Sequence, residues 1–289
     1  NTACLVADGT ILGFVAKQNL AGEGIHYEPR WFKPWPRGVR AEIELDNQNY
    51  PIGDLVFDCG GLRIGFEICE DAWVAERPGA YLAREAVDVI LNPSASHFAF
   101  GKHEVRSRFV IEGSRAFSVA YVYANLLGNE AGRAIYDGDA MIAAAGQLLA
   151  TGPRFSYADC HVTSAVVNIE TIRLGRARTG SFRPAITGDD KRVIDCDFTF
   201  PHLKPAPATT SRASWETSAW VKEEEFARAV SLSLFDYLRK SRSRGFVVSL
   251  SGGADSTACS LLSAWLVHFG VSELGREKFA EKLSYLPRL

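Results

Sequence analysis

A stretch rich in glycine and serine, residues 249–256, constrains the fold of this chain more than any other feature. It reads Ser-Leu-Ser-Gly-Gly-Ala-Asp-Ser and lies between a strand-like run at residues 245–248 and a helix-like run at residues 257–268. Small residues between a strand and a helix let backbone N–H groups approach a phosphate chain, and the helix N-terminus adds a partial positive charge. Asp255 suits such a site where a cation such as Mg²⁺ bridges it to the anion. The stretch predicts a polyphosphate loop of an α/β domain; the alternative is a glycine turn capped by Asp255 and Ser256.

The composition is that of a soluble globular protein. The 289 residues suffice for about two domains, and 47% are hydrophobic. A formal net charge of −2 predicts no nucleic-acid partner. The six cysteines form no Cys-x-x-Cys pair, so neither a zinc site nor a redox motif is indicated. With no signal peptide and no long apolar run, we expect a cytoplasmic protein without a membrane span.

Three glycine turns between apolar runs predict β-hairpins. They lie at Asp8-Gly9, at Gly60-Gly61 and around Gly146. Other segments alternate between helix and strand patterns, which indicates a mixed α/β sheet. The pattern predicts helices at residues 79–86 and 104–118 and strands at residues 87–91, 119–123 and 161–169.

A change of composition near residue 195 indicates a domain boundary. Residues 200–211 are rich in proline, threonine and serine and predict an extended linker. Apolar residues then recur every fourth position, which predicts an amphipathic helix. These residues are Phe226, Val230, Leu234 and Leu238. We predict a first domain at residues 1–194, a linker at 195–215 and a second domain at 216–289.

Both ends of the chain indicate a fragment. Residue 1 is Asn1, and the first ten residues already read as a hairpin. Only 33 residues (289 − 256) follow Ser256, too few to complete an α/β domain. We therefore expect a chain truncated at both ends, or one completed by another chain.

Two motifs resemble known families. The pattern Ser-Gly-Gly-x-Asp-Ser at residues 251–256 resembles the pyrophosphatase loop of enzymes that cleave ATP between the α and β phosphates and adenylylate a substrate. The segment Ile-Cys-Glu-Asp-Ala-Trp at residues 68–73 resembles the nucleophile segment of the nitrilase, or carbon–nitrogen hydrolase, family. Its Cys-Glu-Asp form is similar to the glutaminase half of glutamine-dependent NAD⁺ synthetases. Further segments similar to the family lie at residues 15–20, 91–96, 121–125 and 136–142.

The resemblance covers about residues 1–185 and again 215–289. It implies an α/β fold: a nitrilase-like αββα sandwich, incomplete at its N-terminus, followed by the start of a doubly wound ATP-pyrophosphatase α/β domain. It also implies glutamine, ATP and deamido-NAD⁺ as substrates, Mg²⁺ as cofactor, and assembly into a homo-oligomer.

The resemblance also implies roles for individual residues. Cys69 would attack the side-chain amide of glutamine and form a thioester, and Lys17 would stabilise the oxyanion. On position alone, a cysteine is more often buried and inert, and a lysine is more often solvated. Ser96 and Lys102 match positions that hold the glutamine. The implied ATP contacts are Ser249, Ser251, Gly252, Gly253, Asp255 and Ser256, with Asp255 as the metal ligand.

The general base is the main departure from the family pattern. The family places a glutamate before its lysine, whereas residues 1–16 contain none and the Asp8 turn explains the single carboxylate there. We expect the base on a strand upstream of Asn1. Glu28 matches a second family glutamate that orients the site; the alternative is a surface glutamate before a proline. His97 and His103 form no convincing protease-type triad.

The sequence thus predicts an enzyme that joins glutamine hydrolysis to NAD⁺ synthesis. Ammonia released in the first domain would amidate deamido-NAD⁺ that the second domain has adenylylated with ATP. One alternative is a stand-alone nitrilase-type amidase with an unrelated nucleotide-binding tail. Another is a non-catalytic, truncated product that retains the folds.

Overall fold

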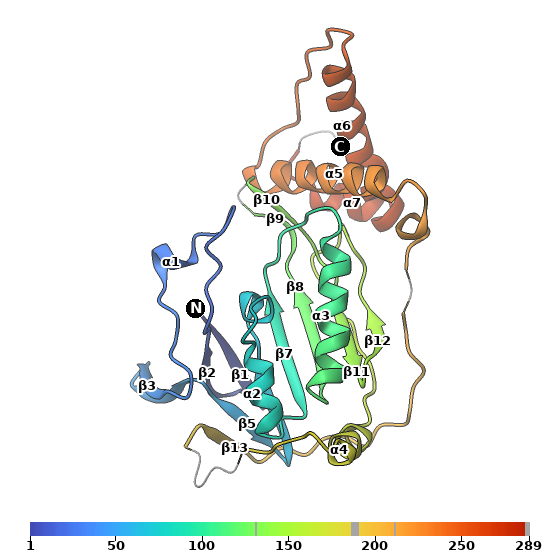
Figure 1. The fold of residues 1–289 in the computed structure, drawn as a ribbon. Helices are drawn as coiled ribbons and strands as arrows, with labels where there is room; N and C mark the ends of the chain where they lie inside the picture. Colours follow the sequence, from blue (N-terminus) through green and yellow to red (C-terminus); the bar gives the residue numbers. More distant parts are fainter. Residues whose placement is uncertain (131, 186–190, 211, 287–289) are drawn as a thin grey trace.

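The computed structural model describes residues 1–130, 132–185, 191–210 and 212–286. A seven-stranded mixed sheet forms its centre, in the order β12-β11-β8-β7-β6-β5-β13 (Figure 1). In that order the strands are Gln147–Thr151, Met141–Ala144, Ala120–Asn125, Val89–Ser94, Leu62–Phe66, Val56–Cys59 and Val193–Cys196.

The central strands β6, β7 and β8 run parallel. The predicted hairpins at Gly60-Gly61 and Gly146 join β5 to β6 and β11 to β12 in antiparallel pairs. Parallel pairing brings the ends of β6 and β7 to one edge of the sheet, where loops can carry functional groups. Helices α2, Pro78–Arg84, and α3, Lys102–Ala116, cover one face (Figure 1). They pack on fully buried core residues such as Val87, Ile90 and Tyr121.

A second sheet packs on the opposite face, so the fold is a sandwich. Its order is β1-β2-β4-β3, and the Asp8-Gly9 hairpin joins β1 to β2 as predicted. Val15 packs with Phe57 and Phe66 of the larger sheet in a core from which water is excluded. The four strands are Thr2–Ala7, Thr10–Ala16, Gln48–Gly53 and Arg40–Leu45. The sequence pattern did not predict the β3–β4 pair.

Two further differences from the sequence pattern concern the end of the first domain. The strand predicted at residues 161–169 is wrong: residues 160–168 form no strand, and helix α4, Ile169–Arg178, follows. Asn168 starts this helix, because its side chain accepts a hydrogen bond from the backbone N–H of Thr171. Strand β13, which was not predicted, pairs in parallel with β5.

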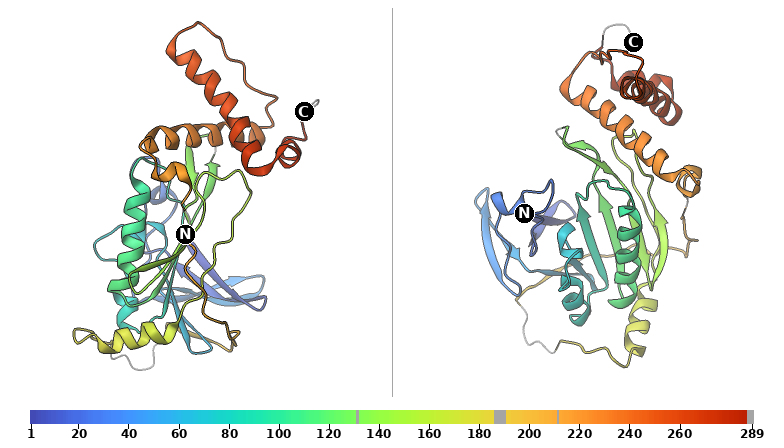
Figure 2. Two further views of the ribbon diagram at one scale, coloured as in Figure 1. Left: turned by 90° about the vertical axis from the view of Figure 1, so that its right-hand side faces the viewer. Right: turned by 45° about the horizontal axis from the view of Figure 1, so that its top comes forward.

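A long helix, α5 (Val221–Ser241), lies across a two-stranded ribbon that extends beyond the sheet (Figures 1 and 2). The ribbon consists of β9, Leu127–Glu130, and β10, Ala134–Asp137. The helix confirms the prediction, but its buried side is different: Phe226 is 50% exposed and Phe235 is fully buried. The pattern of every fourth residue drifts around a helix of 3.6 residues per turn, so it misplaced the face.

The strand predicted at residues 245–248 does not form. Residues 243–250 have no regular structure, and the side chain of Val247 is fully exposed. A strand needs neighbours for its backbone hydrogen bonds, and no strand lies beside this segment in the described residues. Helices α6, Ala254–Leu274, and α7, Arg276–Lys282, follow and pack with α5 (Figure 2).

The remaining described helices are short: α1, Glu28–Trp31, and two 3₁₀ turns, η1 (Cys69–Ala72) and η2 (Ser214–Thr217). Among the described residues no single helix has the length and hydropathy to cross a membrane, although the sharply bent pair α6–α7 meets both criteria together. The domain limits at 194 and 215 stay a prediction.

Candidate active site

Cys69 lies just beyond the C-terminal end of β6, where it opens the turn η1. Its thiol is free and partly exposed. Its φ of 50° lies in the left-handed region, which a residue with a side chain adopts only when the surrounding structure holds it there. The sharp turn points the sulfur away from the sheet and toward a cavity, as expected for a nucleophile.

Asp71 holds this turn in place. One carboxylate oxygen accepts the backbone N–H of Ile68 at 2.9 Å. The other accepts the backbone N–H of Asn19 at 2.8 Å and its side-chain amide at 3.0 Å. Burial raises the pKa of Asp71 to about 6, although these hydrogen bonds oppose the shift. The carboxylate therefore joins the cysteine turn to the loop that follows Lys17.

Lys17 is buried and forms an ion pair with the partly buried Glu28. The ammonium is 2.5 Å from a Glu28 carboxylate oxygen, and Lys17 is only 2% exposed. The backbone N–H of Ala21 and the side chain of Asn1 also donate to Glu28, at 2.6 and 2.5 Å. Burial raises the pKa of Glu28, but the hydrogen bonds from Lys17 and Ala21 outweigh it and the pKa is lowered. The Glu28 carboxylate thus accepts hydrogen bonds from three donors, one of which is the Lys17 ammonium.

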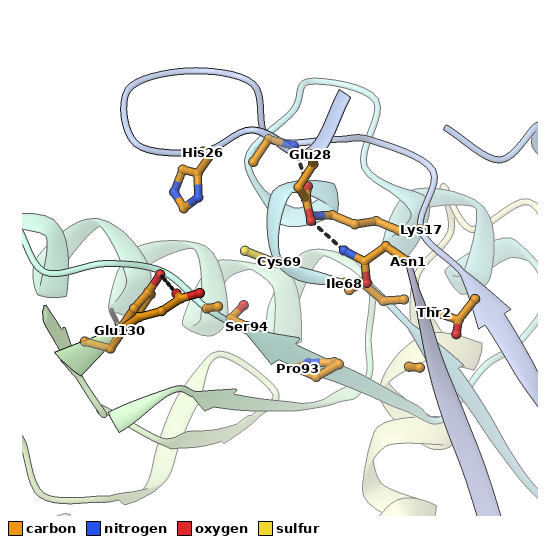
Figure 3. A pocket seen from close by; sticks show the side chains of 14 residues that line it. Asn1, Thr2, Lys17, His26, Glu28, Ile68, Cys69, Pro93, Ser94 and Glu130 are labelled. Atoms are coloured by element: carbon orange, nitrogen blue, oxygen red, sulfur yellow. Dashed lines mark hydrogen bonds and ion pairs between the residues drawn. The ribbon is translucent and has the colours of Figure 1, made fainter. Parts of the chain in front are cut away.

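These groups meet at a cavity of about 380 Å³ (Figure 3). The sulfur of Cys69 lies between the Lys17–Glu28 pair on one side and Ser94 and Glu130 on the other (Figure 3). The Glu130 carboxylate accepts the hydroxyl hydrogen of Tyr136 at 2.7 Å. A thiol, a buried ammonium and carboxylates around one cavity can perform acyl transfer at an amide, since the ammonium can stabilise an oxyanion.

Cys69 also borders a second hollow of about 270 Å³. Ser96 and Lys102 line it, together with Glu70 and Trp73. The hydroxyl of Ser96 is buried and, among the described residues, has no hydrogen-bond partner, so it is free to bind a ligand. Its backbone is fixed by Asn125, which accepts the Ser96 N–H at 2.8 Å and donates to its carbonyl at 3.0 Å.

The second hollow carries charges of both signs. Burial and the nearby Arg106 lower the pKa of Lys102, whose ammonium lies 5.5 Å from the Trp73 ring centre. Burial and nearby Glu28 raise the pKa of Glu70, against the opposing charge of Lys17. An ammonium and a carboxylate in one hollow match the α-carboxylate and α-ammonium groups of an amino acid.

Two histidines that sequence reasoning did not assign to the site border these cavities. The Nε2 of His26 lies 3.1 Å from the Nδ1 of His97, which joins the loop before Glu28 to the loop after β7. Burial and the charge of Lys102 lower the pKa of His97 to about 4, and the pKa of His26 is lowered for the same reasons. Glu70 also lines the second hollow, and the sequence analysis did not predict it as a site residue. Its position next to Cys69 could have indicated it. His103 instead pairs with Asp139 at 2.9 Å.

The glycine-rich loop lies apart from this cavity, at the outer, N-terminal end of α6 (Figure 1). Gly253 precedes the first turn of α6, and Gly252 has a φ of 81°. The hydroxyls of Ser251 and Ser256 are 3.2 Å apart. The residues 249–256 are nearly all exposed, so their N–H and hydroxyl groups are accessible to phosphate oxygens. Nowhere in the described residues do three or more His, Cys, Asp or Glu side chains cluster to hold a metal ion.

The two-sheet sandwich and a cysteine beside a buried lysine that pairs with a glutamate define a carbon–nitrogen hydrolase site. The Carbon-nitrogen hydrolase family model matches residues 1–177, and the chain belongs to this family. It is 33% identical to the glutamine-dependent NAD(+) synthetase of Homo sapiens over 276 residues, and 31% identical to that of Mus musculus over 280 residues. These alignments cover 91% of this chain.

Solved structures of glutamine-dependent NAD(+) synthetases also resemble this chain. The glutamine-dependent NAD(+) synthetase from Cytophaga hutchinsonii has a TM-score of 0.73 and 40% identity, covering 98% of this chain. A structure of the synthetase from Acinetobacter baumannii in complex with ADP, with a TM-score of 0.59, covers 94% of this chain at 19% identity and shares the fold. The chain spans 37–41% of the length of these four relatives. The predicted nitrilase-like α/β fold is confirmed.

Proposed function

We propose that this chain supplies the glutamine-hydrolysing part, and the start of the ATP-dependent part, of a glutamine-dependent NAD⁺ synthetase. The observation that carries the proposal is the placement of Cys69 beside the Lys17–Glu28 pair and between two cavities. The alignments with the relatives extend beyond residue 177 into the second domain, which favours a synthetase over a stand-alone amidase.

In the proposed reaction, the thiolate of Cys69 attacks the side-chain carbonyl carbon of glutamine. The carbonyl oxygen becomes an oxyanion, which the Lys17 ammonium stabilises, while the Glu28 carboxylate orients that ammonium. The C–N bond breaks, the nitrogen takes up a proton and leaves as ammonia, and a thioester remains on Cys69. Water then attacks the thioester, releases glutamate and restores the thiol.

The second hollow supports binding of the glutamine backbone. The ammonium of Lys102 and the free hydroxyl of Ser96 suit the α-carboxylate, and the Glu70 carboxylate suits the α-ammonium. Glu28 already accepts three hydrogen bonds, so we do not assign it as the base that takes the thiol proton. A glutamate upstream of Asn1 is the proposed base.

The proposed role of the second domain is to activate deamido-NAD⁺ with ATP. The residues of the glycine-rich loop fit a polyphosphate: backbone N–H groups and the hydroxyls of Ser251 and Ser256 gather at the first turn of α6. Ser249, Gly252 and Gly253 complete this proposed contact. Asp255 would hold Mg²⁺ together with phosphate oxygens, and the ion would neutralise phosphate charge. We further propose a cytoplasmic homo-oligomer.

The proposal is tested with Cys69→Ala in the intact protein that carries this chain. We expect loss of NAD⁺ formation with glutamine as nitrogen donor and retention of NAD⁺ formation with ammonia. Chromatographic measurement of NAD⁺ with each donor distinguishes the two. A folded variant that loses both activities would contradict the role of Cys69, and hydrolysis of simple amides without any response to ATP would favour the amidase alternative.

A further inference from the structure

Helix α5 buries two carboxylates, Glu225 and Asp236, among mostly apolar side chains. Each is at most 6% exposed. A buried carboxylate is costly unless it is paired and hydrogen-bonded. Both of them contact residues that precede the linker, so they join α5 to the glutaminase part of the chain.

Glu225 is the first member of a continuous chain of buried ion pairs. It accepts a hydrogen bond from the guanidinium of Arg154 at 2.7 Å. Arg154 also donates to Asp137 at 3.1 Å, and Asp137 accepts from Arg106 at 2.7 and 2.8 Å. Arg106 and Asp137 are completely buried. Because Arg154 donates to both acids, a movement of Glu225 displaces Asp137 through a rigid guanidinium group.

Arg106 carries this chain to the second hollow beside Cys69. It lies four residues after Lys102 on α3, so the two side chains share one face of the helix. The same helix turn is held by His103, which pairs with Asp139 at 2.9 Å. The Lys102 ammonium lies 3.4 Å from the Nδ1 of His97 and is repelled by the like charge of Arg106. Asp137, which holds Arg106, therefore acts on Lys102 through this charge and through the shared helix turn.

Asp236 provides a second connection, to the wall of the first cavity. It accepts the backbone N–H of Asn129 at 2.8 Å, and the Asn129 side chain donates to the carbonyl of Ser233 at 3.1 Å. The next residue, Glu130, lines the Cys69 cavity with Tyr136. One face of α5 thus supports groups at both cavities.

We propose that Arg154 and Glu225 are positioning residues of the glutamine pocket, which set the place of Lys102 through Asp137 and Arg106. This inference rests on the proposed function. In this proposal Arg154 does not contact the substrate. It holds the turn of α3 that carries Lys102, which does contact the substrate. The glutamine site is therefore completed only when α5 is docked on the β9–β10 ribbon.

The test compares Glu225→Gln with Glu224→Gln in the intact protein that carries this chain. Glu224 is the neighbouring residue on the same helix and forms an outward pair with Arg228 at 3.0 Å. We expect Glu225→Gln to raise the KM for glutamine about tenfold, the effect of losing one charge-assisted hydrogen bond. The kcat at saturating glutamine and the KM for ammonia should stay within about twofold. Glu224→Gln should match the parent protein, and equal KM values for the two variants would overturn the inference.

Alkylation of Cys69 gives a second, activity-independent measurement. A diazoketone analogue of glutamine needs the positioned pocket, whereas iodoacetamide needs only the thiol. Glu225→Gln and Arg154→Lys should slow the analogue selectively, while general unfolding would change both rates. Selective slowing supports the inference and equal changes overturn it. If the parent protein itself does not discriminate between the reagents, the proposed function fails instead.

Discussion

Single residues at the site are held by groups that are neighbours only in the folded chain. Cys69 adopts its left-handed conformation because Asp71 binds both the Ile68 N–H and the distant Asn19. The same carboxylate is almost completely buried, at 2% exposure. It therefore orders the Cys69 turn at some cost in stability, a combination common at functional sites.

The raised pKa of Asp71 gives a prediction about pH and stability. Its folded value of about 6 exceeds the ordinary value of 3.8, so the folded protein keeps a proton that the unfolded chain releases. The contribution of this group to stability is therefore greatest below about pH 4 and falls as the pH rises through 6, by about 3 kcal/mol in total. Asp71→Asn has no such group, so its free energy of unfolding should rise relative to that of the parent across this range.

Denaturant unfolding of both proteins at pH 4 to 7 measures this difference. The variant also loses one acceptor oxygen, which shifts its free energy of unfolding by the same amount at every pH. The informative quantity is therefore the change with pH of the difference in free energy of unfolding between variant and parent. Asp195→Asn, at an exposed position, serves as the control. A difference between Asp71→Asn and the parent that does not change with pH would contradict the prediction.

At the scale of elements, α5 shows how far a sequence pattern reaches. The existence of the helix follows from regular spacing of apolar residues over many turns, and the structure confirms it. Which side of the helix is buried depends on the elements that the helix packs against. The ribbon and α6 face Phe235 and Leu232, whereas Phe226 stays half exposed.

The two phenylalanines of α5 give a matched prediction. Phe235→Ala removes a fully buried ring that stacks against Phe279, and should lower the free energy of unfolding by about 4 kcal/mol. Phe226→Ala is the same substitution at a position that is 50% exposed, and should change it by less than about 1 kcal/mol. Thermal or denaturant unfolding measures both. Similar losses for the two variants would show that the buried face of α5 is assigned wrongly.

At the scale of the whole molecule, two candidate sites of different chemistry lie in different parts of the chain. The Cys69 cavities are formed by strand ends and loops of the sandwich, and the glycine-rich loop projects from α6 (Figure 1). Their separation predicts that each partial reaction can be removed without the other.

Asp255→Ala in the intact protein tests this separation. We expect loss of NAD⁺ formation with glutamine and with ammonia, because in the proposed reaction both nitrogen donors react with the adenylylated intermediate. Release of glutamate from glutamine should persist at about a tenth of the parent rate or more, a loss within the roughly 5- to 150-fold range typical of coupling between sites. A glutamate assay and a NAD⁺ assay on the same sample measure both. NAD⁺ formation at the parent rate would contradict the role of Asp255.

The sequence alone determined the hairpins, the main helices, the α/β class and the identity of Cys69, Lys17 and the glycine-rich loop as chemical candidates. These depend on local spacing and on short motifs, which a linear chain records directly. Only the tertiary structure decided that Lys17 is buried against Glu28, that His26 meets His97, and that residues 245–248 form no strand. Burial, ion pairing and strand pairing require partners far away in the chain, and no local pattern specifies which partner arrives.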